Sequence, residues 1–186
     1  HIYMDQFDKD RGDVIQRAID NGVNRMICIG VDLNSSEKCL NLAEKYHEVY
    51  ATAGIHPHEA KDAPPKYLHE LEQFYEHEKV LAVGEIGLDY HYNFSDKKEQ
   101  ITIYHEQLEL AKSINLPTIV HCRESEDNIL NGILECKNHY GVIHCFASTL
   151  PFAKQILNTG FHLSFTGLIT FTNTLDAVVE KTPLDH

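Results

Sequence analysis

The sequence predicts an α/β protein with the parallel architecture of a (β/α)₈ barrel, and two observations predict it. Short apolar runs alternate with amphipathic helical patterns along the chain, as in successive right-handed βαβ units. Several of these runs end on a carboxylate or an imidazole, and the active site of a barrel lies at the carboxyl ends of its strands. An open doubly wound sheet is the alternative, but Gly30–Asn34 is not the glycine-rich loop expected after its first strand.

Six apolar runs are predicted to be buried strands. They are Arg25–Gly30, Val49–Ile55, Val80–Gly87, Pro117–His121, Gly141–Phe146 and His162–Gly167. The segments between them carry apolar residues at every third or fourth position, which is typical of helices packed on a sheet. The longest such pattern runs through Ile103, Gln107, Leu110 and Ile114.

The number of predicted strands is smaller than a complete barrel requires. A (β/α)₈ barrel has eight strands and typically about 250 residues, whereas this chain has 186 residues and six predicted strands. We therefore interpret residues 1–186 as a single barrel domain that lacks the first and last strands and is truncated at both ends. His1 opens the chain with no strand before it, and another strand would begin near Leu184–His186.

The composition restricts the class of protein. Lys and Arg number 16 and Asp and Glu 28, and the formal net charge of −12 argues against a basic nucleic-acid-binding surface. It leaves open an enzyme that acts on phosphates, because bound cations reverse the local field. The apolar runs are shorter than the roughly 20 residues of a membrane span, and no signal peptide is visible. The five cysteines form no CxxC pair, which favours a reducing cytoplasm, with the nucleus open in a eukaryote.

Four of the runs end on residues that bind metals. In chain order these are His56 with His58, Glu85, His121 and His144. The carboxyl ends of parallel barrel strands meet at one face, so these side chains are expected to converge there. Imidazole and carboxylate ligands together suit Zn²⁺ or Mn²⁺ and, more weakly, Mg²⁺. The sequence therefore predicts a divalent metal site at this face.

The residues around these strand ends resemble the motifs of one family. Gly84–Asp89 resembles the GE-x-GLD signature of the TatD-like metal-dependent deoxyribonucleases, within the metal-dependent hydrolase superfamily. Gly54–His58 is similar to their G-[VI]-HPH segment, Leu116–Arg123 to LP-x-x-[IV]-HCR and Val142–Phe146 to HCF. The resemblance covers essentially all 186 residues. It implies a TIM barrel, the architecture predicted above.

The resemblance also implies a pair of divalent metal ions (Mg, Mn or Zn) and assigns ligands to them. Glu85 matches the carboxylate that bridges the two ions, and His121 and His144 match histidine ligands of one of them. His1 aligns with the second histidine of the family's HxH motif. The aspartate that ends the last strand in the family has no counterpart, because Asp185 precedes that position.

Further residues have roles beside the metal ligands. His56, with Glu85, is expected to be catalytic, as a donor to a phosphate oxygen or to the leaving group. Arg123 is expected to bind a phosphate as a planar fork, and a salt bridge to a neighbouring glutamate is the alternative. His58 and Asp89 are expected at the substrate, where a tight turn and loop structure are the alternatives.

The activity implied by the resemblance is deoxyribonuclease activity, as a 3′-5′ exonuclease on single strands or frayed ends of DNA. A metal-activated water would attack the phosphodiester. The sequence has no base-reading element, and Tyr90–Tyr92 is either a wall on which bases stack or a packed loop.

Two other functions remain open from the sequence. The first is an amidohydrolase-type metal enzyme acting on a small molecule, for which a carbamylated lysine would bridge the metals, but no lysine ends a predicted strand. The second is a truncated, inactive barrel with an incomplete site. The oligomeric state is not predicted.

Overall fold

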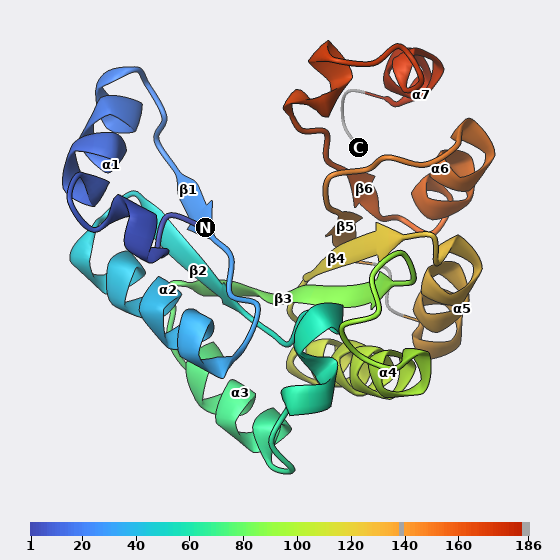
Figure 1. The fold of residues 1–186 in the computed structure, drawn as a ribbon, viewed down its shortest axis with the longest axis horizontal. Coiled ribbons are helices and arrows are strands. Elements are labelled where there is room, and N and C mark those ends of the chain that lie inside the picture. The colour runs from blue at the N-terminus through green and yellow to red at the C-terminus, as the bar shows by residue number, and fades with distance from the viewer. Residues whose placement is uncertain (138–139, 184–186) are drawn as a thin grey trace.

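In the computed structural model, six parallel strands form one sheet in the order β1-β2-β3-β4-β5-β6. The structure describes residues 1–137 and 140–183, so the strand start expected at 184–186 lies outside the described residues. The sheet curls into a half-barrel with helices on its outer side, and its two arms diverge from β3 (Figure 1). The predicted alternation of strands and helices in a parallel barrel architecture is confirmed.

The strands are β1 (Met26–Cys28), β2 (Val49–Ala53), β3 (Val80–Asp89), β4 (Thr118–Arg123), β5 (Gly141–Ile143) and β6 (His162–Leu163). The α-helices are α1 (Arg11–Asp20), α2 (Leu33–Lys45), α3 (Tyr67–Tyr75), α4 (Lys97–Ile114), α5 (Glu126–Cys136), α6 (Leu150–Leu157) and α7 (Asp176–Lys181). Short 3₁₀ helices are η1 (Asp5–Phe7), η2 (Pro57–Asp62) and η3 (Gly167–Thr170). No described helix has both the length and the apolar character that crossing a membrane would require.

Most described strands are shorter than the apolar runs that predicted them. β1, β2, β5 and β6 all end before their runs do, whether they lie at an edge of the described sheet or inside it. β3 is longer than predicted and ends at Asp89, because its last three residues pair with His121–Arg123 of β4. The longest strand is therefore also the one that carries the candidate residues.

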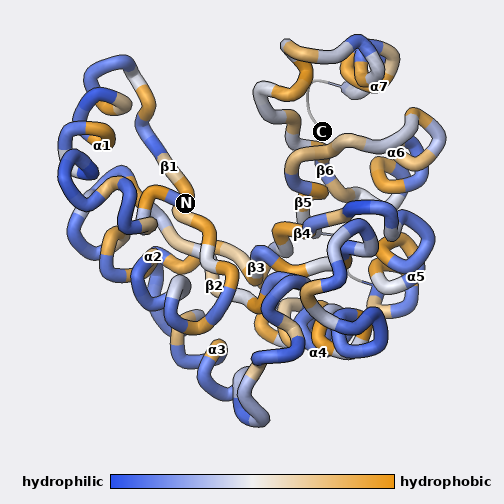
Figure 2. Tube along the Cα trace, in the orientation of Figure 1, coloured by the Kyte–Doolittle hydropathy of each residue, from blue (hydrophilic) through white to orange (hydrophobic). Residues whose placement is uncertain are grey.

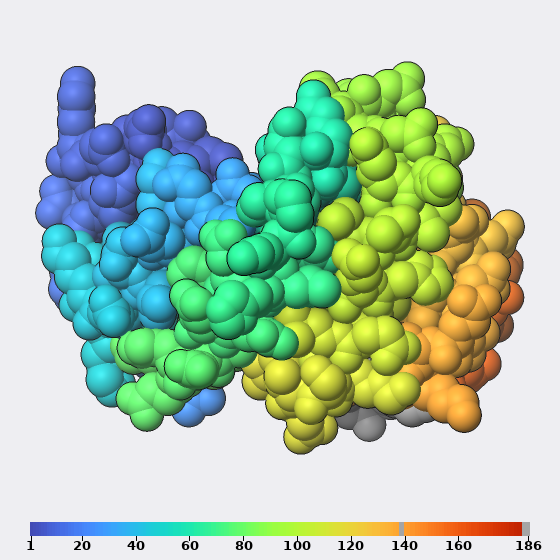
Figure 3. Space-filling model, turned by 90° about the horizontal axis from the view of Figure 1, so that it is seen from below, coloured from blue at the N-terminus to red at the C-terminus, as the bar shows by residue number. Residues whose placement is uncertain are grey.

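Two hydrophobic clusters connect the helices to the sheet. One joins β1 and β2 to α1, α2 and α3, and the other joins β3–β6 to the helices from α4 to α7. Hydrophobic residues follow the strands and the inner helix faces, whereas the outer helix faces are mostly hydrophilic (Figure 2). From below, α3 and α4 lie side by side under the sheet (Figure 3). Tyr75 and Ile114 pack against both clusters and connect the two arms.

A bulge in β3 places Glu85. The register passes from Val83 opposite Thr118 to Ile86 opposite Val120, so β3 has one residue more than β4 at this point. Such bulges bend a strand and redirect a side chain. The Glu85 N–H donates instead to the Gly30 carbonyl, 2.8 Å away, which ties the bulge to the segment after β1.

Gly87 lets β3 and β4 pair beside His121. Its φ of +131° lies in a region that residues with a side chain rarely adopt, and a Cβ at this position would lie 2.0 Å from the His121 carbonyl oxygen. A side chain here would push apart the two strands that carry Glu85 and His121. Glycine is therefore required for the local approach of β3 to β4.

Two buried glutamines of α4 complete the hydrogen bonding at the ends of β2 and β3. The Gln107 side-chain oxygen accepts from the Ile55 N–H (2.7 Å), and its Nε2 donates to the Ile55 carbonyl (3.1 Å). Gln100 does the same for Asp89, at 2.9 Å and 3.0 Å. Gln107 therefore fixes the backbone directly before His56, and Gln100 fixes the backbone of Asp89 itself.

We expect Gly87→Ala to lower the free energy of unfolding by at least about 2 kcal/mol, because it combines a disfavoured φ with a backbone clash. Gly22→Ala is the matched control, since Gly22 also has a positive φ (+87°) but has nothing within 4 Å of the added Cβ. The control should lose only about 1–2 kcal/mol. Chemical denaturation measures both, and equal losses would contradict the role assigned to the close approach.

Gln107→Leu should lower the free energy of unfolding by about 2–4 kcal/mol, because it leaves a buried N–H and a buried carbonyl of Ile55 without partners. Gln73→Leu, at an exposed position of α3, is the control and should change stability by less than about 0.5 kcal/mol. Urea denaturation measures the free energy of unfolding of both variants. Equal stability of the two would contradict this account.

Candidate metal centre

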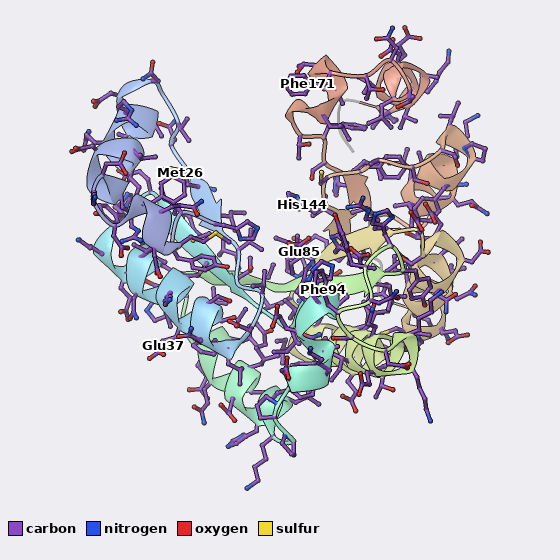
Figure 4. The ribbon with its side chains drawn as sticks, in the orientation of Figure 1. Met26, Glu37, Glu85, Phe94, His144 and Phe171 are labelled. Atoms are coloured by element: carbon purple, nitrogen blue, oxygen red, sulfur yellow. The ribbon has the colours of Figure 1, made fainter. Side chains whose placement is uncertain are left out.

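Three side chains from three successive strands converge on one point. His56 follows β2 at the start of η2, Glu85 lies in the β3 bulge and His121 lies in β4. One donor atom from each lies within 4.8 Å of the others. Glu85 is labelled at the junction of the two arms, with His144 near it (Figure 4). The predicted convergence of strand-end residues is thus present for these three.

Hydrogen bonds connect the centre to a second carboxylate. His121 Nδ1 lies 3.3 Å from Glu85 Oε1, and His121 Nε2 lies 3.0 Å from Asp89 Oδ2. The same Asp89 oxygen lies 2.9 Å from His58 Nε2. Glu85, His121, Asp89 and His58 therefore form one chain in which carboxylates and imidazoles alternate.

Asp89 is fixed from several directions. It is only 1% exposed, and its Oδ1 accepts from the backbone N–H groups of His91 and Tyr92, each at 3.0 Å. Its Oδ2 faces the two imidazoles, and its backbone is paired with Gln100. With its oxygens used in this way, Asp89 orients His58 and His121.

The neighbours of Glu85 keep it ionised although it is buried. Burial alone would raise the pKa of Glu85, but the bond to His121 and the nearby imidazoles of His56 and His144 outweigh burial and lower it. Burial alone would lower the pKa of His121, but its bonds to Glu85 and Asp89 outweigh burial and raise it. Without a metal, both pKa shifts therefore favour a carboxylate paired with an imidazolium.

His56 is neutral and has a defined tautomer. Burial, together with the imidazoles of His121 and His58, lowers the pKa of His56 to about 3. Its Nδ1 accepts from the backbone N–H of His58 at 3.2 Å, so the ring proton of the neutral imidazole is on Nε2. Binding a metal through Nε2 would move that proton to Nδ1 and break the bond from His58. This arrangement favours His56 as a donor over His56 as a ligand.

The donor set of the centre fits a divalent metal. An anionic carboxylate and an imidazole whose second nitrogen bonds to another carboxylate form the carboxylate–histidine–metal arrangement common in metal sites. The 3.3 Å between Glu85 Oε1 and His121 Nδ1 is also a separation usual for two ligands of one ion with bonds of about 2.0–2.2 Å. Glu85 and His121 are therefore the residues best placed to bind an ion.

The other two predicted ligands lie outside this three-residue group. His144 lowers the pKa of Glu85, and its Nδ1 lies 3.2 Å from Ser164 Oγ. His1 is exposed, and its ring contacts Tyr3 edge-on with 5.8 Å between centroids. Within the described residues, the structure brings His144 near the carboxylate but does not bring His1 into the group.

Arg123 lies at the rim of the centre. Its guanidinium is 4.8 Å from the centroid of the Tyr92 ring, and it lines a cavity of about 520 Å³ together with His121 and His144. In the described part of the chain neither neighbouring glutamate pairs with it, because Glu124 pairs with His91 (2.7 Å) and Glu126 accepts from Ser148 (2.7 Å). Arg123 is thus available to an anion.

Sequence reasoning missed the two glutamines that support the centre. Gln107 lies within the apolar stripe predicted for its helix, and Gln100 lies seven residues before it on the same face. A polar residue in an apolar stripe must have a hydrogen-bond partner when it is buried. That spacing was the available signal, although it could not identify Ile55 and Asp89 as the partners.

Comparison with known proteins gives the family. A family model described as TatD related DNase matches residues 1–186. The metal-dependent hydrolase YabD of Bacillus subtilis is 34% identical over 100% of this chain and 74% of its own length. TatD of Erwinia tasmaniensis, named a 3′-5′ ssDNA/RNA exonuclease, is 35% identical over 88% of this chain and 64% of its own length. The chain thus spans between about two thirds and three quarters of these relatives.

Solved structures agree with this result. The TatD homologue YjjV of Escherichia coli K12 superposes with a TM-score of 0.92 at 31% identity, over 99% of this chain and 73% of that one. A TatD family hydrolase of Entamoeba histolytica gives 0.84 at 34% identity, over 91% and 60%. In sequence, fold and strand-end motifs alike, this chain belongs to the TatD family of metal-dependent hydrolases.

Proposed function

We propose that this protein is a divalent-metal-dependent nuclease that hydrolyses DNA from the 3′ end, acting on single strands or frayed ends. The observation that supports this most is the buried, ionised Glu85 between the imidazoles of His56 and His121 at the ends of three strands. The name of the Erwinia relative supports the substrate class. Two cavities adjoin the centre, one lined in part by Asp89 and the other by His121 and His144. They leave room beside the centre for a frayed or single-stranded end.

In this proposal Glu85 would be shared by the two ions of a pair, His121 and His144 would bind one of them, and His1 would be a further ligand. Two divalent ions, when bound, supply Lewis-acid stabilisation of the phosphoryl charge and a water of lowered pKa. Within the protein, Asp89 fixes the tautomer of His121 by accepting from its Nε2, which leaves Nδ1 with a free lone pair.

Other side chains act on the phosphodiester in this proposal. His56 donates a hydrogen bond from its Nε2–H to a phosphate oxygen or to the leaving oxygen, for which its neutral tautomer is suited. Arg123 binds a phosphate, because its charge is not neutralised by the glutamates beside it. His58 bonds to Asp89, and its ring contacts the exposed ring of Phe94 in the loop between β3 and α4. From this position it contributes to substrate binding.

The structure gives less support to amide hydrolysis. That chemistry would call for a carbamylated lysine between the metals, and none of the described strands ends on a lysine. A buried carboxylate occupies the central position instead. We therefore retain the nuclease as the proposed function.

We expect Glu85→Gln to reduce Mn²⁺ affinity and DNA hydrolysis by at least about 100-fold, since even residues that only support a ligand cost 10- to 100-fold when changed. EDTA should abolish hydrolysis by the unmodified protein, and Mn²⁺ should restore it. Isothermal titration calorimetry and cleavage of a 5′-labelled oligonucleotide measure the two effects.

Glu37→Gln is the matched control, because Glu37 is an exposed carboxylate on α2, away from the centre (Figure 4). It should leave metal affinity and hydrolysis within about twofold of the unmodified protein. Hydrolysis that persists in Glu85→Gln would refute the metal-dependent nuclease.

Asp89→Asn should lower metal affinity about 10- to 100-fold, because it removes the negative charge that orients His121. In the metal-free protein it should also lower the pKa of His121, which NMR titration of the ring protons measures. Asp62→Asn, at an exposed carboxylate of η2, should change neither quantity. An unchanged His121 pKa in Asp89→Asn would show that Asp89 does not act through His121.

A further inference from the structure

Two exposed aromatic side chains lie beside the metal centre in the loop between β3 and α4. Phe94 is 53% exposed and Tyr92 41% exposed, and their ring centroids are 5.4 Å apart with the planes tilted by 33°. The Phe94 ring also lies 4.7 Å from the ring of His58, which bonds to Asp89. We call Tyr92 and Phe94 the aromatic pair.

The loop that carries the aromatic pair is fixed by hydrogen bonds at both ends. At its start, the Tyr92 N–H donates to Asp89 Oδ1 (3.0 Å). At its end, Ser95 Oγ donates to the His58 carbonyl (2.9 Å), and Gln100 Nε2 donates to the Ser95 carbonyl (3.0 Å). The rings are therefore presented in place, which reduces the entropy lost when a ligand stacks on them.

Cationic side chains lie on two sides of the aromatic pair although the whole chain is acidic. The Arg123 guanidinium lies 4.8 Å from the Tyr92 centroid. On the other side, Lys61 and Lys97 line a cavity of about 510 Å³ together with both rings and with the carboxylates of Asp89 and Asp96. Exposed rings next to cationic groups match a strand that carries flat bases and phosphates.

The neighbouring residues of the predicted stacking wall are engaged elsewhere. Lys97 Nζ lies 4.2 Å from the Tyr90 centroid and covers that ring. His91 pairs with Glu124 at 2.7 Å. Of the segment Tyr90–Tyr92, Tyr92 is the exposed tyrosine, and Phe94, which lies outside that segment, joins it as an exposed ring.

We propose that the aromatic pair is the subsite that stacks the nucleobases of a single strand whose terminal phosphodiester lies at the metal centre. This inference rests on the proposed nuclease function. Bases within a duplex are stacked on each other and do not present their faces, so the subsite selects unpaired strand ends. Arg123 then lies where it can bind the phosphate next to a stacked base.

The test is binding of 5′-fluorescein oligothymidylate with phosphorothioate linkages, measured by anisotropy in EDTA so that no cleavage occurs. A second oligonucleotide carries abasic residues at its last two 3′ positions. Phe94→Ala should raise the Kd for the first oligonucleotide about 5- to 150-fold. The same variant should change the Kd for the abasic oligonucleotide less than about twofold, because no base remains to stack.

Two further variants separate stacking from a structural effect. Phe94→Tyr keeps an aromatic face and should bind the first oligonucleotide within about twofold of the unmodified protein. Phe171→Ala removes a more exposed ring (85% against 53% for Phe94) that lies away from Phe94, toward α7 (Figure 4), and it should leave Kd unchanged. A similar loss in Phe94→Tyr, or an equal effect of Phe94→Ala on both oligonucleotides, would overturn the subsite. If the unmodified protein bound neither oligonucleotide in EDTA, the subsite would also be overturned. Failure of the nuclease proposal is seen separately, as absence of Mn²⁺-dependent cleavage of an ordinary phosphodiester strand by the unmodified protein.

Discussion

The arrangement of this site depends on keeping a carboxylate ionised inside the protein. Glu85 is 5% exposed, and an unpaired buried charge would cost several kcal/mol. The neighbouring imidazole of His121 offsets that cost, and Asp89 in turn stabilises the imidazolium. An incoming cation can replace the proton of His121 as the partner of Glu85. Charge balance thus makes the metal-free site stable and prepares it for a divalent ion.

Helix α4 fixes the positions of the carboxyl ends of β2 and β3 relative to each other. Gln100 and Gln107 are two helical turns apart, and each pairs with the backbone at one strand end. Because one rigid helix makes both contacts, the segments that carry His56 and Asp89 cannot shift independently. The bulge in β3 and the close approach at Gly87 likewise fix Glu85 and His121 relative to each other. The site is therefore positioned from its outer helix as well as from the sheet.

The parallel fold and its three convergent residues could be predicted because strand periodicity and strand-end chemistry are local features of the sequence. The edge strands were predicted too long, since Arg25–Gly30 and His162–Gly167 are apolar but have a hydrogen-bonding partner for only part of their length. The tautomer of His56 depends on a turn that brings the His58 N–H back to its ring, and spacing alone does not show this. The sequence likewise could not identify the partner of Arg123, because that partner is the ring of Tyr92, in the loop after another strand.

The most direct measurement is anomalous diffraction from a crystal soaked in Mn²⁺ after EDTA treatment. The account predicts a peak bonded to both the Glu85 carboxylate and His121 Nδ1, at about 2.0–2.3 Å, with the His121–Asp89 contact retained. A peak bonded elsewhere, or a direct Glu85–His121 contact that persists in saturating Mn²⁺ with no peak between them, would contradict it.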